Sequence, residues 1–219
     1  MSAVRQHFAA IASVYDRANR VLSLGLDRSW RERAVRLLRG RCAAALDLAC
    51  GTGDFSLAIA RRFPGARVTG VDFTPEMLGF ARRKADSPRI EFRQGDAQDL
   101  SGFTDGSFDL VACAFGFRNF PDAGAALREA RRVLRGGGEL LVLEFFRPRS
   151  RILGALVSLW LRAVYPFFGA RRREAYAHLR ASIASTASEE EFSALASRAG
   201  FSPRERRFFF PCCTALVLA

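Results

Sequence analysis

The sequence predicts a doubly wound α/β fold with a mostly parallel sheet of seven strands. Short apolar runs alternate with helical patterns between residues 43 and 145, which is typical of parallel βαβ units. A Gly51-Thr52-Gly53 turn follows the first apolar run, and Asp47, Asp72 and Asp96 stand near the ends of the first three. Ligands of open α/β sheets bind at the carboxyl ends of the strands, so these residues predict a ligand site there.

Each element of the sheet is expected from its own pattern. Strands are expected at about 43–48, 66–72, 89–94, 108–114, 139–145, 201–210 and 214–218, the last two antiparallel at one edge. Helices are expected at about 54–63, 74–85, 122–135 and 188–200. Thr74 and Asp122 are predicted N-caps because their side chains can accept a backbone N–H of the first turn. The glycines at 136–138 are expected to end the third of these helices.

Two helices are expected before the first strand. Apolar residues recur at helical spacing over 4–22, a turn follows at 23–25, and a second helix begins at about Asp27, the expected N-cap, and ends near residue 38. We expect a single domain over 1–219, with 1–40 as a helical cap over the carboxyl edge of the sheet. A basic helical lid is expected at 147–185, where the alternating pattern breaks.

The charge balance predicts a polyanionic neighbour. The chain has a formal net charge of +12 from 34 Lys and Arg residues, of which only Lys84 is lysine. Eight arginines and one acid, Glu174, fall within residues 147–180. Such an excess favours either nucleic acid or an anionic membrane surface.

The cysteines predict neither a metal site nor disulfides. Cys42, Cys50, Cys113, Cys212 and Cys213 show no C-x-x-C spacing. We interpret them as reduced, partly buried thiols of a cytoplasmic protein. No signal peptide is expected, because the first residues lack a continuous apolar run.

The glycine turn differs from the phosphate-binding motifs. No Gly-Lys-Ser/Thr follows it, and Ser56 stands where G-x-G-x-x-G requires the third glycine. Asp72 suits ribose hydroxyls, and Asp96 suits an adenine amino group. An acidic pocket without a phosphate ligand favours a cationic nucleoside such as S-adenosyl-L-methionine. The alternative is that the three acids only cap helices and turns.

With these features the sequence resembles a class I methyltransferase, and more narrowly the quinone-biosynthesis C-methyltransferases that act on demethylmenaquinol and polyprenyl-benzoquinols. The resemblance runs nearly end to end. It is carried by Phe8, Ala12, Tyr15-Asp16, Asn19, Ser23, Gly25 and Trp30, by the stretch 46–54, by Phe115-Gly116-Phe117-Arg118-Asn119 and by Val142-Leu143-Glu144-Phe145.

The resemblance implies S-adenosyl-L-methionine as the cofactor, with contacts at Thr52, Asp72, Asp96 and Ala97. We expect further cofactor contacts at Tyr15, Asp47, Gly51, Gly53, Phe73, Met77, Ala114 and Phe115. The chain departs from the family pattern at Ala114, where serine is usual, and at His178, where tyrosine is usual.

C-methylation of a quinol needs a positioned, electron-rich ring carbon and stabilised negative charge on the neighbouring oxygen. Arg118 is predicted to stabilise the quinolate and Asn119 to orient a hydroxyl or water. His178 and Tyr176 complete the predicted catalytic set, His178 as a base. The alternatives are that Arg118 pairs with an acid of the lid and that His178 serves packing.

The apolar run 152–161 has ten residues, too few to span a bilayer, which needs about 20. Beside flanking arginines it suits an amphipathic segment at a membrane surface; packing on the protein's own core or a dimer contact is the alternative. The predicted partners are therefore a polyprenyl quinol and an anionic membrane surface, with a homodimer left open. The predicted location is cytoplasmic and peripherally membrane-associated.

Three rival functions stay open. A nucleic-acid methyltransferase would also be basic, but Asn/Asp-Pro-Pro-aromatic is absent after the fourth strand, and there is no separate nucleic-acid module. We therefore expect no nucleic-acid partner. The others are a small-molecule or phospholipid methyltransferase and a non-catalytic scaffold that binds S-adenosylmethionine.

Overall fold

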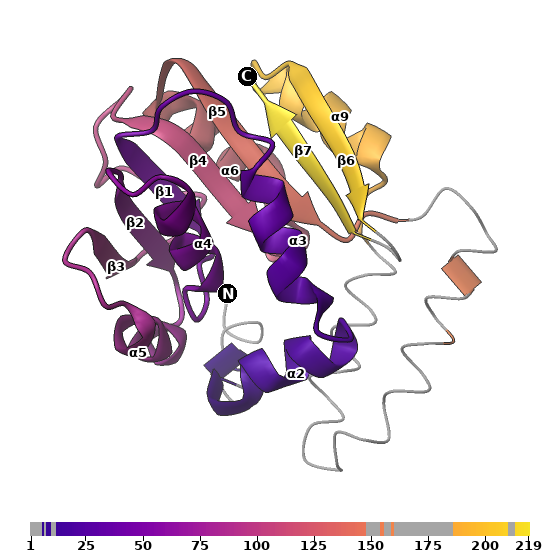
Figure 1. Ribbon diagram of the computed structural model, residues 1–219. Coiled ribbons are helices and arrows are strands. Elements are labelled where there is room, and N and C mark those ends of the chain that lie inside the picture. The colour runs from indigo at the N-terminus through magenta and orange to yellow at the C-terminus, as the bar shows by residue number, and fades with distance from the viewer. Residues whose placement is uncertain are drawn as a thin grey trace.

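The computed structural model describes residues 6, 8–9, 12–147, 154–155, 159, 186–209 and 213–219. Its centre is one seven-stranded sheet in the order β3-β2-β1-β4-β5-β7-β6 (Figure 1). The strands are β1 (Ala44–Leu48), β2 (Arg67–Asp72), β3 (Ile90–Gln94), β4 (Phe108–Ala114), β5 (Leu134–Glu144), β6 (Pro203–Phe209) and β7 (Cys213–Leu218). The first five are parallel, and β7 runs antiparallel to both β5 and β6. This confirms the predicted fold class and the antiparallel closing pair.

Helices cover both faces of the sheet. They are α2 (Tyr15–Leu22), α3 (Leu26–Val35), α4 (Asp54–Arg62), α5 (Pro75–Lys84), α6 (Ala123–Val133) and α9 (Glu189–Arg198), with short 3-10 turns η1 (Ala12–Val14) and η2 (Phe117–Asn119). Alternate side chains of each strand enter opposite cores. In β4, Leu110 and Ala112 belong to the core under α3 and α4, whereas Val111 and Cys113 belong to the core under α6 and α9.

Local capping accounts for the predicted starts of α6 and α9. The Asp122 carboxylate accepts the Ala125 N–H at 2.9 Å at the start of α6. Ser188 and Glu191 form a complete capping box at the start of α9. Thr74 is the N-cap residue of α5, with Pro75 at the first helical position, although its side chain makes no capping hydrogen bond.

The start of β5 was predicted wrongly. The glycines at 136–138 do not end α6; the helix stops at Val133 and β5 begins at Leu134. Leu134 pairs with Phe108, and the register then shifts before Leu110. A methyl group on Gly138 would lie 3.0 Å from the Asp109 carbonyl oxygen, so this glycine allows two strands to approach closely at an irregularity.

The second N-terminal helix also differs from the prediction. Gly25, with φ of 77°, is the N-cap residue of α3, and Asp27 lies inside the helix. The buried Asp27 carboxylate accepts Arg31 Nη1 at 2.7 Å and the Ser23 hydroxyl at 3.1 Å. α3 packs through Trp30 and its neighbours onto α4 and a face of the sheet, and of these two helices it is α2 that lies at the carboxyl edge (Figure 1).

The described residues bear on the predictions about cysteines, membrane-spanning helices and metal sites. Cys42, Cys50 and Cys113 are free thiols, and Cys50, Cys113 and Cys213 are buried; Cys212 and most of the predicted lid lie outside the described residues. Within the described ranges, no helix is long and apolar enough to cross a membrane, and no cluster of side chains could hold a metal ion.

Candidate functional site

The turn between β1 and α4 is shaped by left-handed backbone conformations. Ala49, Gly51 and Gly53 have φ of 51°, 55° and 85°. A methyl group on Gly53 would lie 2.8 Å from Cζ of Phe92, so glycine is required there for both backbone and space. Ala49 adopts its positive φ despite its Cβ, and such strain is concentrated at functional sites.

Asp47 supports this glycine loop from beneath. Its carboxylate is fully buried and accepts the Ser56 hydroxyl at 2.6 Å through Oδ2, while Oδ1 has no hydrogen-bond partner among the described residues. Desolvation raises the pKa of Asp47 to about 7. Asp47 was predicted as a cofactor contact; it is buried and is not among the residues that line the pocket, so that contact stays a prediction.

Asp72 joins the glycine loop to the start of α5. One carboxylate oxygen accepts the Gly51 N–H at 2.8 Å, and the other accepts the Thr74 N–H at 2.8 Å. Burial raises the pKa of Asp72. Since a carboxylate has about four acceptor positions, these two bonds leave positions for ribose hydroxyls. Asp72 thus caps a turn, as the alternative interpretation held, and also lines the pocket.

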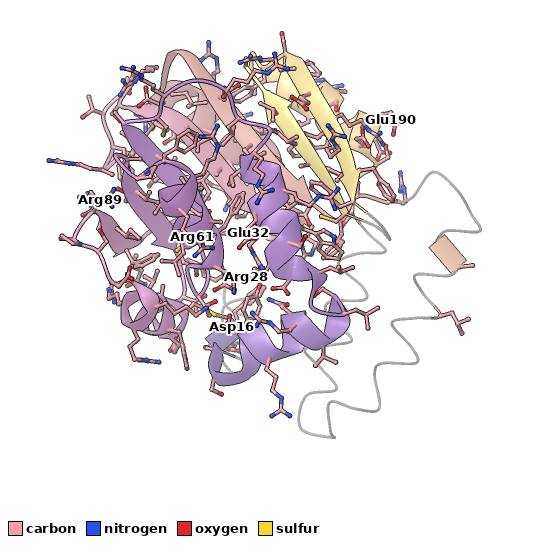
Figure 2. All side chains as sticks on the ribbon, in the orientation of Figure 1. Asp16, Arg28, Glu32, Arg61, Arg89 and Glu190 are labelled. Atoms are coloured by element: carbon pink, nitrogen blue, oxygen red, sulfur yellow. The ribbon has the colours of Figure 1, made fainter. Side chains whose placement is uncertain are left out.

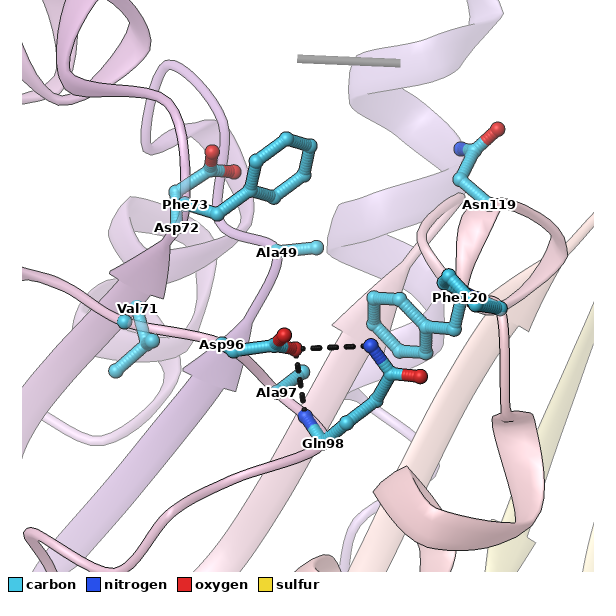
Figure 3. A pocket seen from close by; sticks show the side chains of 11 residues that line it. Ala49, Val71, Asp72, Phe73, Asp96, Ala97, Gln98, Asn119 and Phe120 are labelled. Atoms are coloured by element: carbon cyan, nitrogen blue, oxygen red, sulfur yellow. Dashed lines mark hydrogen bonds between the residues drawn. The ribbon is translucent and has the colours of Figure 1, made fainter. Parts of the chain in front are cut away.

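A pocket opens at the carboxyl ends of β1, β2, β3 and β4 (Figure 3). Its lining residues are Ala49, Val71, Asp72, Phe73, Gly95, Asp96, Ala97, Gln98, Asn119, Phe120 and Pro121. The walls are mainly apolar, and the carboxylates of Asp72 and Asp96 provide the acidic groups. This combination suits a nucleoside, whose base needs apolar walls and whose hydroxyl and amino groups need acceptors.

Gln98 orients Asp96 in this pocket. Asp96 Oδ1 accepts both the Gln98 backbone N–H at 2.9 Å and its side-chain Nε2 at 3.1 Å (Figure 3). The Gln98 Oε1 in turn accepts the Asp122 N–H at 2.8 Å. Sequence reasoning missed Gln98, because its partners belong to loops after different strands and no local pattern marks it.

The loop after β4 forms the opposite wall. Phe115 has φ of 60°, and its N–H donates to the Leu143 carbonyl at 2.7 Å. A methyl group on Gly116 would lie 2.6 Å from Cys113 Sγ, so glycine is needed for the close turn. This turn directs Asn119 into the pocket wall, where its Nδ2 also donates to the Phe115 carbonyl at 3.3 Å.

Arg118 is buried and paired with Glu144. Its Nη1 lies 2.5 Å from Glu144 Oε1, and the two side chains are only 6% and 1% exposed. The guanidinium lies 5.9 and 5.6 Å from the ring centroids of Phe115 and Phe145, which stack at 4.6 Å. The acidic partner therefore belongs to the end of β5 and not to the lid. Arg118 Nε is buried without a hydrogen-bond partner in the described part of the chain.

The structure brings most predicted site residues to one edge. Asp72, Phe73, Asp96, Ala97 and Asn119 line the pocket. Gly51, Thr52 and Tyr15 lie beside it at the glycine loop; a methyl group on Gly51 would lie 3.9 Å from Tyr15 Cε1.

Met77, Ala114 and Phe115 do not line the pocket. Met77 is 1% exposed inside α5. Ala114 is half-buried and packs on the core under α3 and α4, to which Phe115 also belongs. Tyr176 and His178 lie outside the described residues.

The sheet order, the glycine loop after β1 and the two acids that line the pocket at the carboxyl edge together define a class I S-adenosylmethionine-dependent methyltransferase. The pocket residues fit this cofactor because acidic acceptors are present and no phosphate cradle is. The ubiE/COQ5 methyltransferase family matches residues 1–210, and the chain belongs to this family.

Relatives agree with this family, and a solved structure shares the fold. A demethylmenaquinone methyltransferase of Deinococcus radiodurans is 42% identical over 214 residues, covering 95% of this chain and 88% of that protein. A ubiquinone/menaquinone biosynthesis C-methyltransferase UbiE of Geobacter sulfurreducens is 40% identical, covering 93% and 82%. A solved SAM-dependent methyltransferase of Thermotoga maritima shares the fold with a TM-score of 0.70 at 21% identity, covering 97% of this chain and 98% of that one.

Proposed function

We propose that this enzyme methylates a ring carbon of a polyprenylated quinol in menaquinone or ubiquinone biosynthesis, with demethylmenaquinol as the favoured substrate. The observation that carries the proposal is the buried Arg118 beside the pocket wall, with an unpaired Nε next to two stacked aromatic rings. The names of the Deinococcus and Geobacter relatives support the class of substrate.

Each residue of this wall has a role that quinol methylation requires. When bound, S-adenosylmethionine supplies an electrophilic methyl group. Arg118 can donate through Nε to the oxygen of a quinolate and stabilise its charge, while Glu144 holds the guanidinium in place. Asn119 lies on the pocket wall and orients a hydroxyl or water. The new C–C bond would form at the ring carbon beside the ionised oxygen as the bond between the methyl group and sulfur breaks and a neutral thioether departs, and the proton on that ring carbon would then leave to a base. His178 and Tyr176 are our proposed candidates for that step.

Mass spectrometry tests the reaction. The protein is incubated with S-adenosylmethionine and either a reduced short-chain demethylmenaquinol or the corresponding benzoquinol. We expect one added methylene in the product, on the naphthoquinol ring in preference to the benzoquinol ring. Product from neither quinol would overturn the proposal, and cofactor binding without turnover would favour the non-catalytic scaffold instead.

We further propose that the enzyme works at the cytoplasmic surface of an anionic membrane, because a polyprenyl quinol resides in the bilayer. The net charge of +12 and the arginine-rich segment 147–180 support this. The turn after α2 adds apolar contacts, since Val21 and Leu24 are 40% and 67% exposed near the exposed Arg17 and Arg20. Interfacial segments combine such apolar and basic side chains.

Liposome sedimentation tests the membrane proposal. We expect binding to anionic vesicles, release by salt, and weaker binding of Leu24→Ser than of the wild type. Equal binding to neutral and anionic vesicles would contradict the electrostatic part. Sedimentation without vesicles measures whether the protein forms the homodimer that the sequence left open.

A further inference from the structure

The only lysine of the chain lies at the centre of a charged cluster beside the glycine loop. Lys84 is the last residue of α5. Its Nζ lies 2.5 Å from Asp16 Oδ2, 2.6 Å from Asp54 Oδ1 and 2.9 Å from Thr52 Oγ1. These three acceptors belong to α2, to the first residue of α4 and to the glycine loop, so one ammonium group joins four parts of the fold.

The cluster also provides the polar attachment of α2. Within the described residues, the hydrogen bonds and ion pairs between α2 and the sheet domain all involve Asp16, which accepts the Thr52 hydroxyl at 2.5 Å as well as the Lys84 ammonium. Asp16 lies where α2 approaches α5 (Figure 2). Tyr15, the residue before it, has its ring over Gly51. Whatever holds Asp16 therefore also holds Tyr15 over the loop.

The charge balance of the cluster depends on the Lys84 ammonium. Asp16 and Asp54 are both anionic and face the same cation, and Arg31 Nη1 is 4.0 Å from the other oxygen of Asp54. Without Lys84 the two carboxylates would lie close together with less compensation, and α2 would be repelled from the start of α4. The side chains of Lys84, Asp16 and Asp54 are only 26%, 35% and 28% exposed, so water screens them incompletely.

The geometry also favours lysine over arginine. Of the 34 Lys and Arg residues, 33 are arginine, yet this position has lysine. A compact ammonium has three donors that can point to three separate acceptors, whereas the planar guanidinium fork suits two acceptors in one plane. The contacts of Lys84 match the ammonium, with one donor for each of Asp16, Asp54 and Thr52.

We propose that Lys84 is a positioning residue that fixes α2 on the glycine loop and thereby forms the part of the cofactor site covered by Tyr15. Thr52 couples α2 to the glycine loop, because its hydroxyl donates to Asp16 and accepts from Lys84 while its backbone forms the centre of the loop. Bound S-adenosylmethionine and a docked α2 then stabilise each other. The proposal concerns the cofactor and needs no assumption about the methyl acceptor.

Calorimetric titration with S-adenosylmethionine tests this coupling in Lys84→Met, Lys84→Arg and Asp16→Asn. The matched control is Arg83→Met, which removes a neighbouring exposed cation of the same helix turn. We expect Lys84→Met to weaken cofactor binding about tenfold, Lys84→Arg to weaken it less, and Arg83→Met to leave it unchanged. The double variant Lys84→Met/Asp16→Asn should lose less than the sum of the single losses.

Two further readouts separate positioning from general destabilisation. Trypsin cleavage after the exposed Arg17 and Arg20 of α2 should be slowed by S-adenosylmethionine in the wild type and in Arg83→Met, and much less in Lys84→Met. In wild-type protein labelled at lysine Cε, the single resonance should shift when the cofactor saturates the site. Equal cofactor affinity and equal α2 protection in Lys84→Met and Arg83→Met, or an unmoved lysine resonance, would overturn the proposal. All three measurements stand even if no quinol is methylated.

Discussion

At the scale of single residues, Asp72 and Asp96 combine a structural role with a place in the pocket wall. Asp72 shows this most clearly, because its two oxygens hold the backbone of the glycine loop and of the α5 start before any ligand arrives. Asp96 is likewise held by Gln98 through one oxygen. Preorganised carboxylates of this kind bind a ligand without first giving up their own geometry.

We predict that Asp72→Ala abolishes measurable binding of S-adenosylmethionine, a loss of about 100-fold or more. The substitution removes the acceptor for the ligand and leaves the Gly51 and Thr74 N–H groups without their partner. Calorimetric titration measures the effect, with the exposed Asp86→Ala as control. Retained affinity in Asp72→Ala would show that this carboxylate contributes only to the loop.

Arg118 and Glu144 form a buried ion pair, so their single variants report stability as well as turnover. Arg118→Met should lower the free energy of unfolding by about 3 kcal/mol, because it leaves Glu144 buried without its cation. Arg118→Met/Glu144→Gln should recover much of that loss in urea denaturation. We expect the double variant to bind S-adenosylmethionine but to turn over quinol far more slowly than the wild type; equal turnover would remove Arg118 from the proposed chemistry.

At the scale of elements, the packing of β2 against β3 and α5 determines the position of the glycine loop. Gly70 of β2 faces Phe92 of β3, whose ring also lies against Gly53. A methyl group on Gly70 would lie 2.6 Å from Phe92 Cδ1 and 2.9 Å from Cys50 Sγ. These contacts leave no room for a side chain in the middle of β2.

Gly70→Ala should therefore destabilise the protein by about 1–3 kcal/mol through overpacking. It should also weaken cofactor binding, because a displaced Phe92 ring presses on the loop. Thermal and urea unfolding measure the first effect and calorimetry the second. Gly65→Ala is the control, since a methyl group there meets nothing within 4 Å. Similar stability of the two variants would mean that Phe92 can move without cost.

At the scale of the whole molecule, Asp47 should make stability depend on pH. Burial raises its folded-state pKa to about 7 from the ordinary 3.8. The folded protein thus holds a proton that the unfolded chain releases, and this stabilisation is fully present below pH 3.8 and is lost as the pH rises through 7. The raised pKa of Asp72 acts in the same direction.

The wild type should therefore lose stability as the pH rises from about 4 to about 7, with a slope of up to about 1.4 kcal/mol per pH unit. Asp47→Asn carries no titrating group and should show a flatter profile. Urea denaturation of both proteins without cofactor across this pH range measures the difference between their free energies of unfolding. Groups that titrate alike in the two proteins cancel in this difference. Parallel profiles would show that Asp47 keeps an ordinary pKa.

The elements that the sequence predicted well are those whose signals are local. Strand cores, the capping residues Asp122 and Ser188, and the glycine loop depend on neighbours within a few positions, so their residue types specify them. The start of β5 and the placement of α3 were wrong for the opposite reason. A strand irregularity opposite Phe108 and the burial of Trp30 on a distant face are decided by residues far away in the chain.

The same division holds for the site. By itself, the sequence determined the fold class, the edge of the sheet at which the pocket opens and two of the acids that line it, because parallel strands bring their carboxyl ends together. Only the tertiary structure decided that Asp47 lies beneath the loop, that Gln98 orients Asp96, that Glu144 pairs with Arg118 and that Lys84 joins α2 to the glycine loop. Asp96 and Gln98 are two residues apart in one loop, but the other contacts join side chains from separate elements, and no periodicity or spacing along the chain indicates which of these side chains meet.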